Sequence, residues 1–285
     1  MKNFKLYIFV FLMLPLSLAA QFTGGVGRGE FKVDYVSPDV LLNVKVFLES
    51  VYNPVNDNMN TTLNTTLNLI PLSQPYNNGT SWSYNGTENV AAIPSGIVDW
   101  VLVELRDAPT PDAALSGTKL TGWPKAFFLK SDGSIVDLDG VSMPAIGNPV
   151  ILNNLYVVVR HRNHLSIMSS TGAISVNNIY SYDFTTDVTK AFGGANGYKL
   201  IGTLPLRYGM VAGDIDNDGN IFVADYNSWA ANAGISGLYF GQDLDMDGNI
   251  FISDYNFWAS NAGLINNPVL KSAAIKSLYT SGVPK

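Results

Sequence analysis

Two nearly identical acidic loops close to the C-terminus constrain this chain more than any other feature. Residues 214–225 and 243–254 each place aspartate at positions 1, 3, 5 and 12 of a twelve-residue loop, with glycine at position 6. Calcium prefers about six to eight oxygen ligands, and glycine at position 6 permits the sharp turn that lets short carboxylates converge. All eight acidic residues after residue 205 occupy these positions. The pattern therefore predicts two calcium sites rather than a solvated acidic surface.

The two predicted sites use equivalent ligands. Side-chain oxygens come from positions 1, 3, 5 and 12, and a backbone carbonyl comes from position 7. Position 9 is phenylalanine in both loops (Phe222 and Phe251), so water is expected to complete the coordination there. The predicted ligands of the two calcium ions are Asp214, Asp216, Asp218, Asn220 and Asp225 in the first loop, and Asp243, Asp245, Asp247, Asn249 and Asp254 in the second.

The loops belong to an internal repeat with a period of 29 residues. Residues 214–234 and 243–263 share fifteen of twenty-one positions, including a Tyr and a Trp three residues apart after each loop. This spacing places both rings on one side of a short helix, and Gly234 and Gly263 follow where a helix C-terminus favours a left-handed residue. The segments before the loops lack a helical apolar period. The repeat is predicted to be a loop–helix unit that packs against its copy.

A pair of loop–helix calcium units resembles the dockerin module of bacterial secreted polysaccharide-degrading systems. The resemblance covers about residues 212–265 and is carried by the eight aspartates. Dockerins that bind cohesin usually have small hydroxyl residues at loop positions 10 and 11. Here those positions are Val223-Ala224 and Ile252-Ser253, a difference that leaves the metal ligands intact and argues against cohesin as the partner.

The N-terminus predicts secretion. Residues 1–20 begin with two lysines, continue as an apolar run and end in Ala19-Ala20, the order of a secretory signal peptide. The apolar run is shorter than the ~20 residues that span a membrane, and no second such segment follows. The chain is therefore expected to be secreted or at the surface of a bacterial cell, with the periplasm as an alternative, and to have no membrane span after cleavage.

Charge and cysteine content exclude several classes of function. Without residues 1–20 the chain keeps 15 Lys and Arg against 23 Asp and Glu, a net charge of −8. An acidic chain without a basic stripe does not suit nucleic acid or an anionic membrane. The chain has no cysteine, so disulfides cannot stabilise it outside the cell. Bound calcium would supply part of that stabilisation.

Residues 21–205 are predicted to be a mainly β domain. The segment 42–49 alternates, 98–106 is apolar on both faces as in a central strand, and 126–130 leads through an Asp-Gly turn into 135–138. A further strand starts at 155 and is expected to continue to 168. Such spacing predicts an antiparallel β-sandwich, either immunoglobulin-like or jelly-roll. This region is also similar to a module that recurs in bacterial secreted and surface proteins, a resemblance that implies no particular activity.

The full predicted layout has four parts. They are a signal peptide at 1–20, a β-sandwich at 21–205, a dockerin-like tandem calcium module at 206–267 and a tail at 268–285. No Pro/Thr-rich linker separates the sandwich from the calcium module, so direct docking of the two is expected.

Candidate catalytic groups are few. His161 and His164 are the only histidines, and positions i and i+3 of a continuous strand face opposite sides, which favours a structural role over a metal grip. Glu104 lies in the predicted central strand, where a buried pair with Arg106 or another arginine is the commoner arrangement than a glycosidase carboxylate. No nucleophile elbow, zinc-protease motif or phosphate loop is present. No catalytic residue is predicted.

A carbohydrate site is an alternative function. Tyr76, Trp82 and Tyr84 lie among asparagine, threonine and serine residues, and rings that stack on sugars beside amide groups are typical of such sites. The competing interpretation is an irregular loop whose rings fill the sandwich edge. Three hypotheses follow: a non-catalytic extracellular protein that binds a protein or glycan partner, a carbohydrate-binding accessory of a polysaccharide-degrading system, and a glycan-active enzyme.

Overall fold

The computed structural model describes residues 39–77, 82, 84–265, 279–280 and 283–284. The predicted signal peptide lies outside these residues, as does most of the predicted tail. The described residues group as one compact unit.

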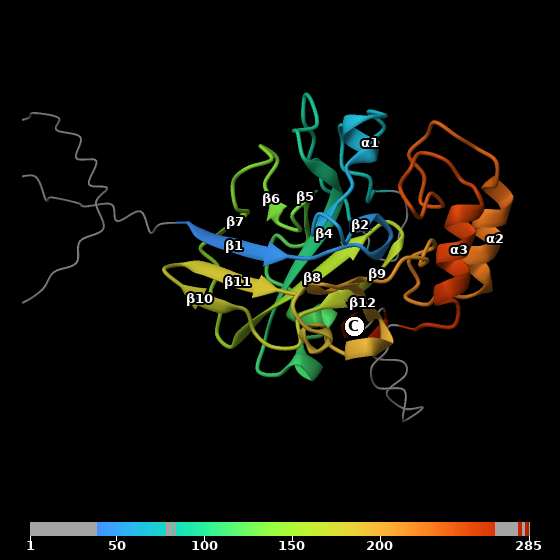
Figure 1. Ribbon diagram of the computed structural model, residues 1–285. Coiled ribbons are helices and arrows are strands. Elements are labelled where there is room, and N and C mark those ends of the chain that lie inside the picture. The colour runs from blue at the N-terminus through green and yellow to red at the C-terminus, as the bar shows by residue number, and fades with distance from the viewer. Residues whose placement is uncertain (1–38, 78–81, 83, 266–278, 281–282, 285) are drawn as a thin grey trace, which may run out of the picture. The chain divides into compact units, whose positions relative to one another are not determined.

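The larger of the two main sheets is antiparallel and has five strands (Figure 1). Its central strand, β4, pairs with β5 on one side and β8 on the other. It is buried along nearly its whole length. This confirms the predicted central strand, and the Asp132-Gly133 turn joins the next two strands as predicted. In the order β6-β5-β4-β8-β9, the strands are Ile135–Val136, Lys125–Lys130, Ile97–Ala108, Asn154–His161 and His164–Met168.

A second, four-stranded sheet contains the predicted N-terminal strand, which ends at Lys45 instead of continuing to residue 49. In the order β10-β11-β1-β7, its strands are Ile174–Val176, Ile179–Asp183, Val40–Lys45 and Ala145–Gly147. The prediction of a wholly antiparallel arrangement is wrong at one pair, since β1 and β11 run parallel. Alternation of apolar residues fixes which face of a strand is buried but not the direction of its partner.

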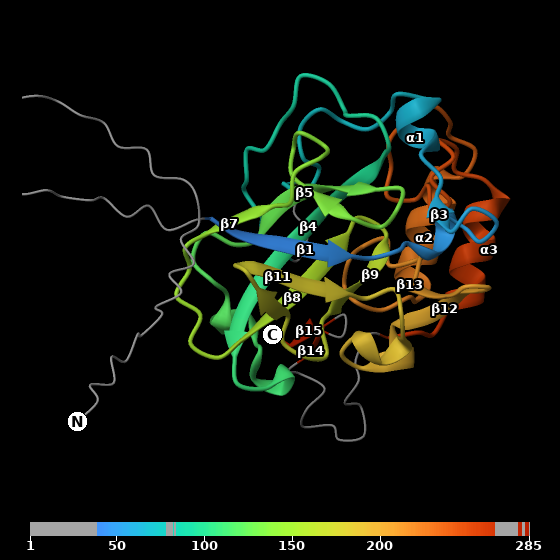
Figure 2. The ribbon, with the colours of Figure 1, turned by 60° about the vertical axis from the view of Figure 1, so that its left-hand side comes forward.

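The two sheets share one hydrophobic core. Leu42 of β1 and Tyr182 of β11 belong to the same buried cluster as Trp100 of β4. Figure 2 shows β1 and β11 crossing in front of β4 and β8. The protein is therefore mainly β, with side chains of both sheets meeting between them.

The predicted strand from 155 to 168 is in fact a hairpin. β8 ends at His161, the chain turns at Arg162 and Asn163, and β9 begins at His164. His161 and His164 are consequently paired across the hairpin rather than on opposite faces. The turn lacks the Asn-Gly or Asp-Gly pair that marks most two-residue hairpins, which is why the sequence predicts one strand.

Two helices follow the acidic loops and lie side by side (Figure 1, Figure 2). They are α2, Val223–Asn232, and α3, Ile252–Asn261. Gly234 and Gly263 beyond their ends have φ of +93° and +91°, so the predicted loop–helix units and their left-handed ends are confirmed. Among the described residues, no helix combines the length and apolar character needed to cross a bilayer.

The remaining elements are short. The strand pairs are β2 Tyr52–Asn53 with β3 Asn58–Met59, β12 Tyr198–Thr203 with β13 Leu206–Met210, and β14 Tyr279–Thr280 with β15 Val283–Pro284. The helical turns are α1 Thr62–Thr65 and the 3-10 segments Glu49–Val51, Pro111–Ala113, Ser116–Thr118, Val188–Lys190 and Gly194–Asn196. The predicted domain boundary at 205/206 falls within the β12–β13 hairpin, and the division into domains stays a prediction.

The turn between β8 and β9 contacts both acidic loops directly. Asn163 donates from Nδ2 to the carbonyl of Asp243 at 2.8 Å and accepts from the Gly213 amide at 2.9 Å. Asn217 of the first loop donates to the carbonyl of Arg162 at 3.3 Å. The loops therefore dock on the β structure without a linker, as expected.

Candidate functional site

Each acidic loop gathers three carboxylates. In each group, one oxygen of every carboxylate lies within 4.8 Å of the others. The first group is Asp214, Asp216 and Asp225, and the second is Asp243, Asp245 and Asp254. These six are loop positions 1, 3 and 12 of the two predicted sites.

The backbone of each loop explains why the carboxylates converge. Positions 4 and 6 are left-handed in both copies, with φ of 60° at Asn217, 88° at Gly219, 57° at Met246 and 86° at Gly248. These turns fold the chain back, so that Asp225 accepts the amide of Ile215 at 2.7 Å. The first residue of each loop in turn accepts the amide of the position-6 glycine.

The position-12 carboxylate has a second role at each helix start. Asp225 accepts the amide of Phe222 at 2.9 Å, and Asp254 accepts that of Phe251 at 2.7 Å. These amides belong to the residues that precede the helices, where backbone donors have no partner within the helix. The same aspartate thus closes the loop and begins the helix.

The predicted ligands at positions 5 and 7 lie differently. Asp218 and Asp247 are outside the two groups of converging oxygens. Each accepts a hydrogen bond at 2.8 Å from the amide of the asparagine at position 7, Asn220 or Asn249. Their assignment as calcium ligands remains a prediction.

Clustering and burial perturb these carboxyl groups. Burial raises the pKa of Asp225 and Asp254 to about 6 and that of Asp243 to about 7. Burial, followed by the charge of Asp225, holds the pKa of Asp214 well above its usual range. Without a cation, the clusters therefore retain protons that ordinary aspartates lose.

The donor set fits a hard cation. Each group offers carboxylate oxygens, the ligands that calcium prefers over nitrogen or sulfur. In addition, Asp214 Oδ2 is buried and has no hydrogen-bond partner among the described residues. An unpaired buried carboxylate oxygen is costly unless an ion or a donor meets it, so the residues present could hold a calcium ion.

The two repeats contact each other reciprocally. Trp229 of α2 donates from Nε1 to the carbonyl of Phe251 at 3.1 Å, and Trp258 of α3 donates to that of Phe222 at 3.0 Å. The four repeated rings form one cluster, with the rings of Tyr226 and Trp258 centred 5.1 Å apart. Each tryptophan therefore binds the loop of the other repeat.

Backbone hydrogen bonds also connect the two repeats reciprocally. Ile221 at position 8 of the first loop donates to the carbonyl of Leu264, which follows α3. Ile250 at position 8 of the second loop donates to the carbonyl of Ile235, which follows α2. Each repeat therefore supplies the backbone acceptor that the loop of the other repeat uses.

A buried charged network lies directly behind the turn that contacts the loops. Asp99 accepts from Arg162 Nε at 2.9 Å and from the Tyr239 hydroxyl at 2.6 Å, and it lies 3.2 Å from His161 Nε2. Burial alone would raise the pKa of Asp99, but the charge of Arg162 and the His161 hydrogen bond hold it at about 2. Tyr239 lies between the two loops, so this network links them to β4.

The histidines are structural in this arrangement. Both are fully buried, their Nδ1 atoms are 3.1 Å apart, and the outer nitrogen of His164 lies 3.2 Å from Ser50 Oγ. Burial lowers the pKa of both, and the charges of His161 and Arg162 lower that of His164 further. Burial therefore disfavours protonation of both rings.

Glu104 is held as a carboxylate, not as a glycosidase acid. It accepts from Arg106 Nε at 2.6 Å and lies 3.6 Å from Arg160. Burial opposes ionisation, but the charges of Arg160 and Arg106 outweigh it and lower the pKa of Glu104. A general acid needs a raised pKa, so this site favours the buried ion pair over the enzyme hypothesis.

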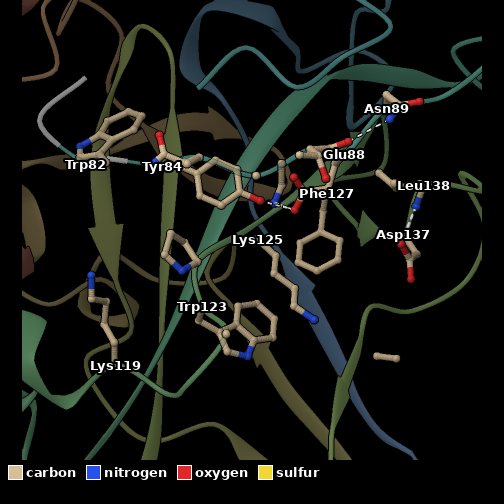
Figure 3. Close-up of a pocket in the computed structure, with 17 residues that line it drawn as sticks. Trp82, Tyr84, Glu88, Asn89, Lys119, Trp123, Lys125, Phe127, Asp137 and Leu138 are labelled. Carbon is tan, nitrogen blue, oxygen red and sulfur yellow. Dashed lines mark hydrogen bonds between the residues drawn. The ribbon is translucent and has the colours of Figure 1, made fainter. Parts of the chain in front are cut away.

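The three predicted sugar-binding rings separate into two groups. Tyr76 is buried to 1% exposure and donates to the carbonyl of Trp100 at 2.8 Å, which removes it from the surface. Trp82 and Tyr84 instead line a cavity, together with Trp123 (Figure 3). The sequence does not predict Trp123 as part of this group, because it lies 39 residues beyond Tyr84 and only the fold brings the two rings to one cavity.

Comparisons with known proteins assign no family. No family profile and no curated protein matches the chain. Two solved structures that show some likeness are interface mutants of a type II cohesin–X-dockerin complex from Acetivibrio cellulolyticus. One match has a TM-score of 0.36 and 13% identity, covering 79% of this chain and 97% of that chain. The other has a TM-score of 0.34 and 14% identity, covering 80% and 95%. Likenesses this weak assign neither a fold nor a function.

Proposed function

We propose that this chain is a secreted, non-catalytic calcium-binding protein that acts in extracellular interaction or surface structure. The observation that supports it most strongly is the equivalent convergence of three carboxylates in each acidic loop. Asp214, Asp216, Asp218, Asp225 and the Asn220 carbonyl would hold one ion. Asp243, Asp245, Asp247, Asp254 and the Asn249 carbonyl would hold the other.

Calcium would stabilise the fold by offsetting carboxylate repulsion. Three carboxylates within a few ångströms, two of them buried in each group, repel one another when ionised. A divalent ion removes this repulsion, and any ligand of the folded state adds RT ln(1 + [L]/Kd) to its stability. Because Asp243 is hydrogen-bonded to the β8–β9 turn, part of this stabilisation would reach the β domain.

The test compares thermal unfolding in calcium and in chelator. The wild-type chain should melt at a higher temperature in calcium and should bind two ions by titration calorimetry. The double variant Asp218→Ala/Asp247→Ala should lose the calcium-dependent increase. Asp112→Ala/Asp132→Ala, which removes two exposed carboxylates outside the loops, is the matched control and should keep it. A wild-type melting temperature that is the same in chelator would refute calcium binding.

Exposed apolar side chains at the two helix starts support the interaction role. Phe222 and Phe251 are 46% and 45% exposed, and Val223 and Ile252 are 66% and 65% exposed. All four lie at the starts of α2 and α3, at positions 9 and 10 of the loops. Each helix start thus exposes two adjacent apolar side chains. Exposed apolar surface is typical of protein-binding sites, so we assign the surface formed by these two helix starts to a protein partner.

The partner test replaces one exposed apolar side chain at each helix start by a charged one. Val223→Lys/Ile252→Lys should bind calcium as wild type does, because neither side chain is a predicted ligand. Both chains would be applied to a panel of immobilised cohesins. Cohesin binding that the double variant abolishes would show that the sequence argument against cohesin is wrong. Binding that the variant retains would place the contact elsewhere and remove this surface from the proposal.

A further inference from the structure

A cavity of about 850 Å³ opens beside the larger sheet, outside the calcium loops. Most of its wall is formed by Trp82 with residues 84–89, by residues between 119 and 127 that lead into β5, and by residues 137–138. Pockets for small ligands typically have volumes of about 300–1,000 Å³. The size therefore suits a ligand of one or a few rings.

The wall formed by residues 84–89 is fixed by hydrogen bonds to the β structure. Gln74 is 5% exposed and donates to the carbonyl of Gly86 at 2.8 Å. Glu88 accepts the Tyr84 hydroxyl and also the Ala126 amide, the latter at 3.3 Å. Because Ala126 belongs to β5, the loop is tied to the sheet and the cavity exists before a ligand arrives.

Aromatic rings supply the apolar part of the lining. Trp82 is half-buried, and Tyr84 and Trp123 are each 8% exposed. The Trp123 ring packs against that of Phe127, with the ring centroids 5.9 Å apart. Lys125 Nζ lies 5.3 Å from the centroid of the Trp123 ring. Figure 3 shows the labelled rings around the same space, with Lys119 and Lys125 beside them. Rigid rings of this kind accept the C–H face of a flat ligand.

The polar part of the lining has both signs of charge. Lys119 and Lys125 are balanced by Glu88 and Asp137, and Asn85, Thr87 and Asn89 add exposed amide and hydroxyl groups. A balanced lining gives no advantage to a phosphate or another strong anion, and so many polar groups disfavour a lipid. The chemistry that matches rings beside amides, hydroxyls and balanced charges is a polyhydroxylated ring.

We propose that this cavity is a saccharide-binding site, in which Trp82 and Trp123 contact pyranose rings and Asn85 and Lys119 bind their hydroxyl groups. The proposal does not depend on calcium, because the cavity shares no lining residue with either acidic loop. Tyr76 takes no direct part. Its ring lies 5.8 Å from that of Trp82, and it supports that residue from inside the core.

The experiment measures retention of the full secreted chain on insoluble and immobilised polysaccharides, with both neutral and uronic-acid backbones. Two binding variants are used. Asn85→Ala/Lys119→Ala changes only exposed side chains, so it should fold normally. Trp82→Ala removes a ring, and Trp82→Phe restores an aromatic surface. The matched control, Asn153→Ala/Lys130→Ala, changes the same residue types outside the lining. Melting temperatures are recorded for every chain.

Retention on at least one polysaccharide class is expected. Both Trp82→Ala and the Asn85/Lys119 double variant should weaken it by about tenfold or more, the equivalent of 1.4 kcal/mol. Trp82→Phe should recover most of it, and the control should match wild type. Absence of retention on every class would overturn the proposal, as would retention by Asn85→Ala/Lys119→Ala equal to wild type. Either result leaves the calcium proposal intact, since that is measured by the chelator-dependent melt.

Discussion

Asp99 shows how this protein keeps a charge in its interior. The side chain is fully buried, yet it stays ionised because Arg162, His161 and Tyr239 all converge on it. Arg162 also stacks on the Tyr239 ring, with its guanidinium carbon 4.3 Å from the ring centroid. A buried ion pair adds little net stability when intact, but removing one partner leaves the other uncompensated. Asp99 is therefore the residue at which a single-atom change should matter most.

Asp99→Asn should destabilise the protein by about 3–5 kcal/mol, because it leaves Arg162 buried without a counter-charge. The comparison variant is Asp57→Asn. Asp57 pairs with Arg207 at 2.7 Å, but both side chains are partly exposed, so its loss should cost about 1 kcal/mol or less. Urea unfolding of both variants measures the difference. Equal costs would show that the Asp99 network carries no special role.

Single residues were predictable where their role depends on local spacing. The six converging aspartates follow from positions 1, 3 and 12 of each loop, since neighbouring turns alone bring them together. Asn163 could not be found in this way, because its contact with Asp243 joins residues 80 positions apart. The sequence places Tyr76 in a ligand site, because aromatic residues among polar ones are typical of exposed rings. Its burial is decided by Trp100, which lies 24 residues away.

The second acidic loop also packs a side chain into the hydrophobic core. Met246 at position 4 is 2% exposed and belongs to the main hydrophobic cluster of the β domain. Its backbone is left-handed, with φ of 57°, a conformation that is unfavourable for a bulky residue. The equivalent residue of the first loop is Asn217, for which this conformation is common. Burial of the Met246 side chain therefore offsets a local backbone cost.

Met246→Ala should lower the free energy of unfolding by about 2–5 kcal/mol, because it opens a cavity between the loop and the β domain. Met246→Leu keeps the buried volume and the same backbone cost, and should lose less than about 1.5 kcal/mol. Urea titration in saturating calcium measures both. If the two variants were equally unstable, the loss would not follow the buried volume, and the packing argument for this position would be wrong.

Elements were predictable where their pattern is internal. The central strand β4 and the β5–β6 hairpin follow from apolar content and an Asp-Gly turn. The β8–β9 turn does not follow from the sequence, because Arg162 and Asn163 make contacts there with the acidic loops and lack the usual turn residues. The parallel pairing of β1 with β11 also depends on contacts between distant segments, which periodicity does not encode.

For the whole molecule, calcium and protons should compete for the acidic loops. Burial raises the pKa of Asp225, Asp254 and Asp243 to about 6 or 7 in the calcium-free fold, against about 3.9 in an unfolded chain. The folded state then binds more protons than the unfolded state between these values. This contribution to stability is complete below about pH 4 and is lost as the pH rises through 6 to 7.

The calcium-dependent rise in melting temperature should therefore be small near pH 5 and large near pH 8. At the higher pH the carboxylates have already lost their protons, so calcium binds without displacing any. Scanning calorimetry with calcium and with chelator across this range measures the rise directly. A rise that is constant or larger at pH 5 would contradict the proposed carboxylate ligands.

The reciprocal contacts between the repeats bear on how the calcium-loop module can be divided. One repeat alone would leave the carbonyl that precedes its helix without a tryptophan, and the position-8 amide of its loop without a backbone partner. The other copy supplies both groups. A single 29-residue repeat is therefore not a complete folding unit, and a chain cut between residues 234 and 243 would separate two halves that each lack the same partners.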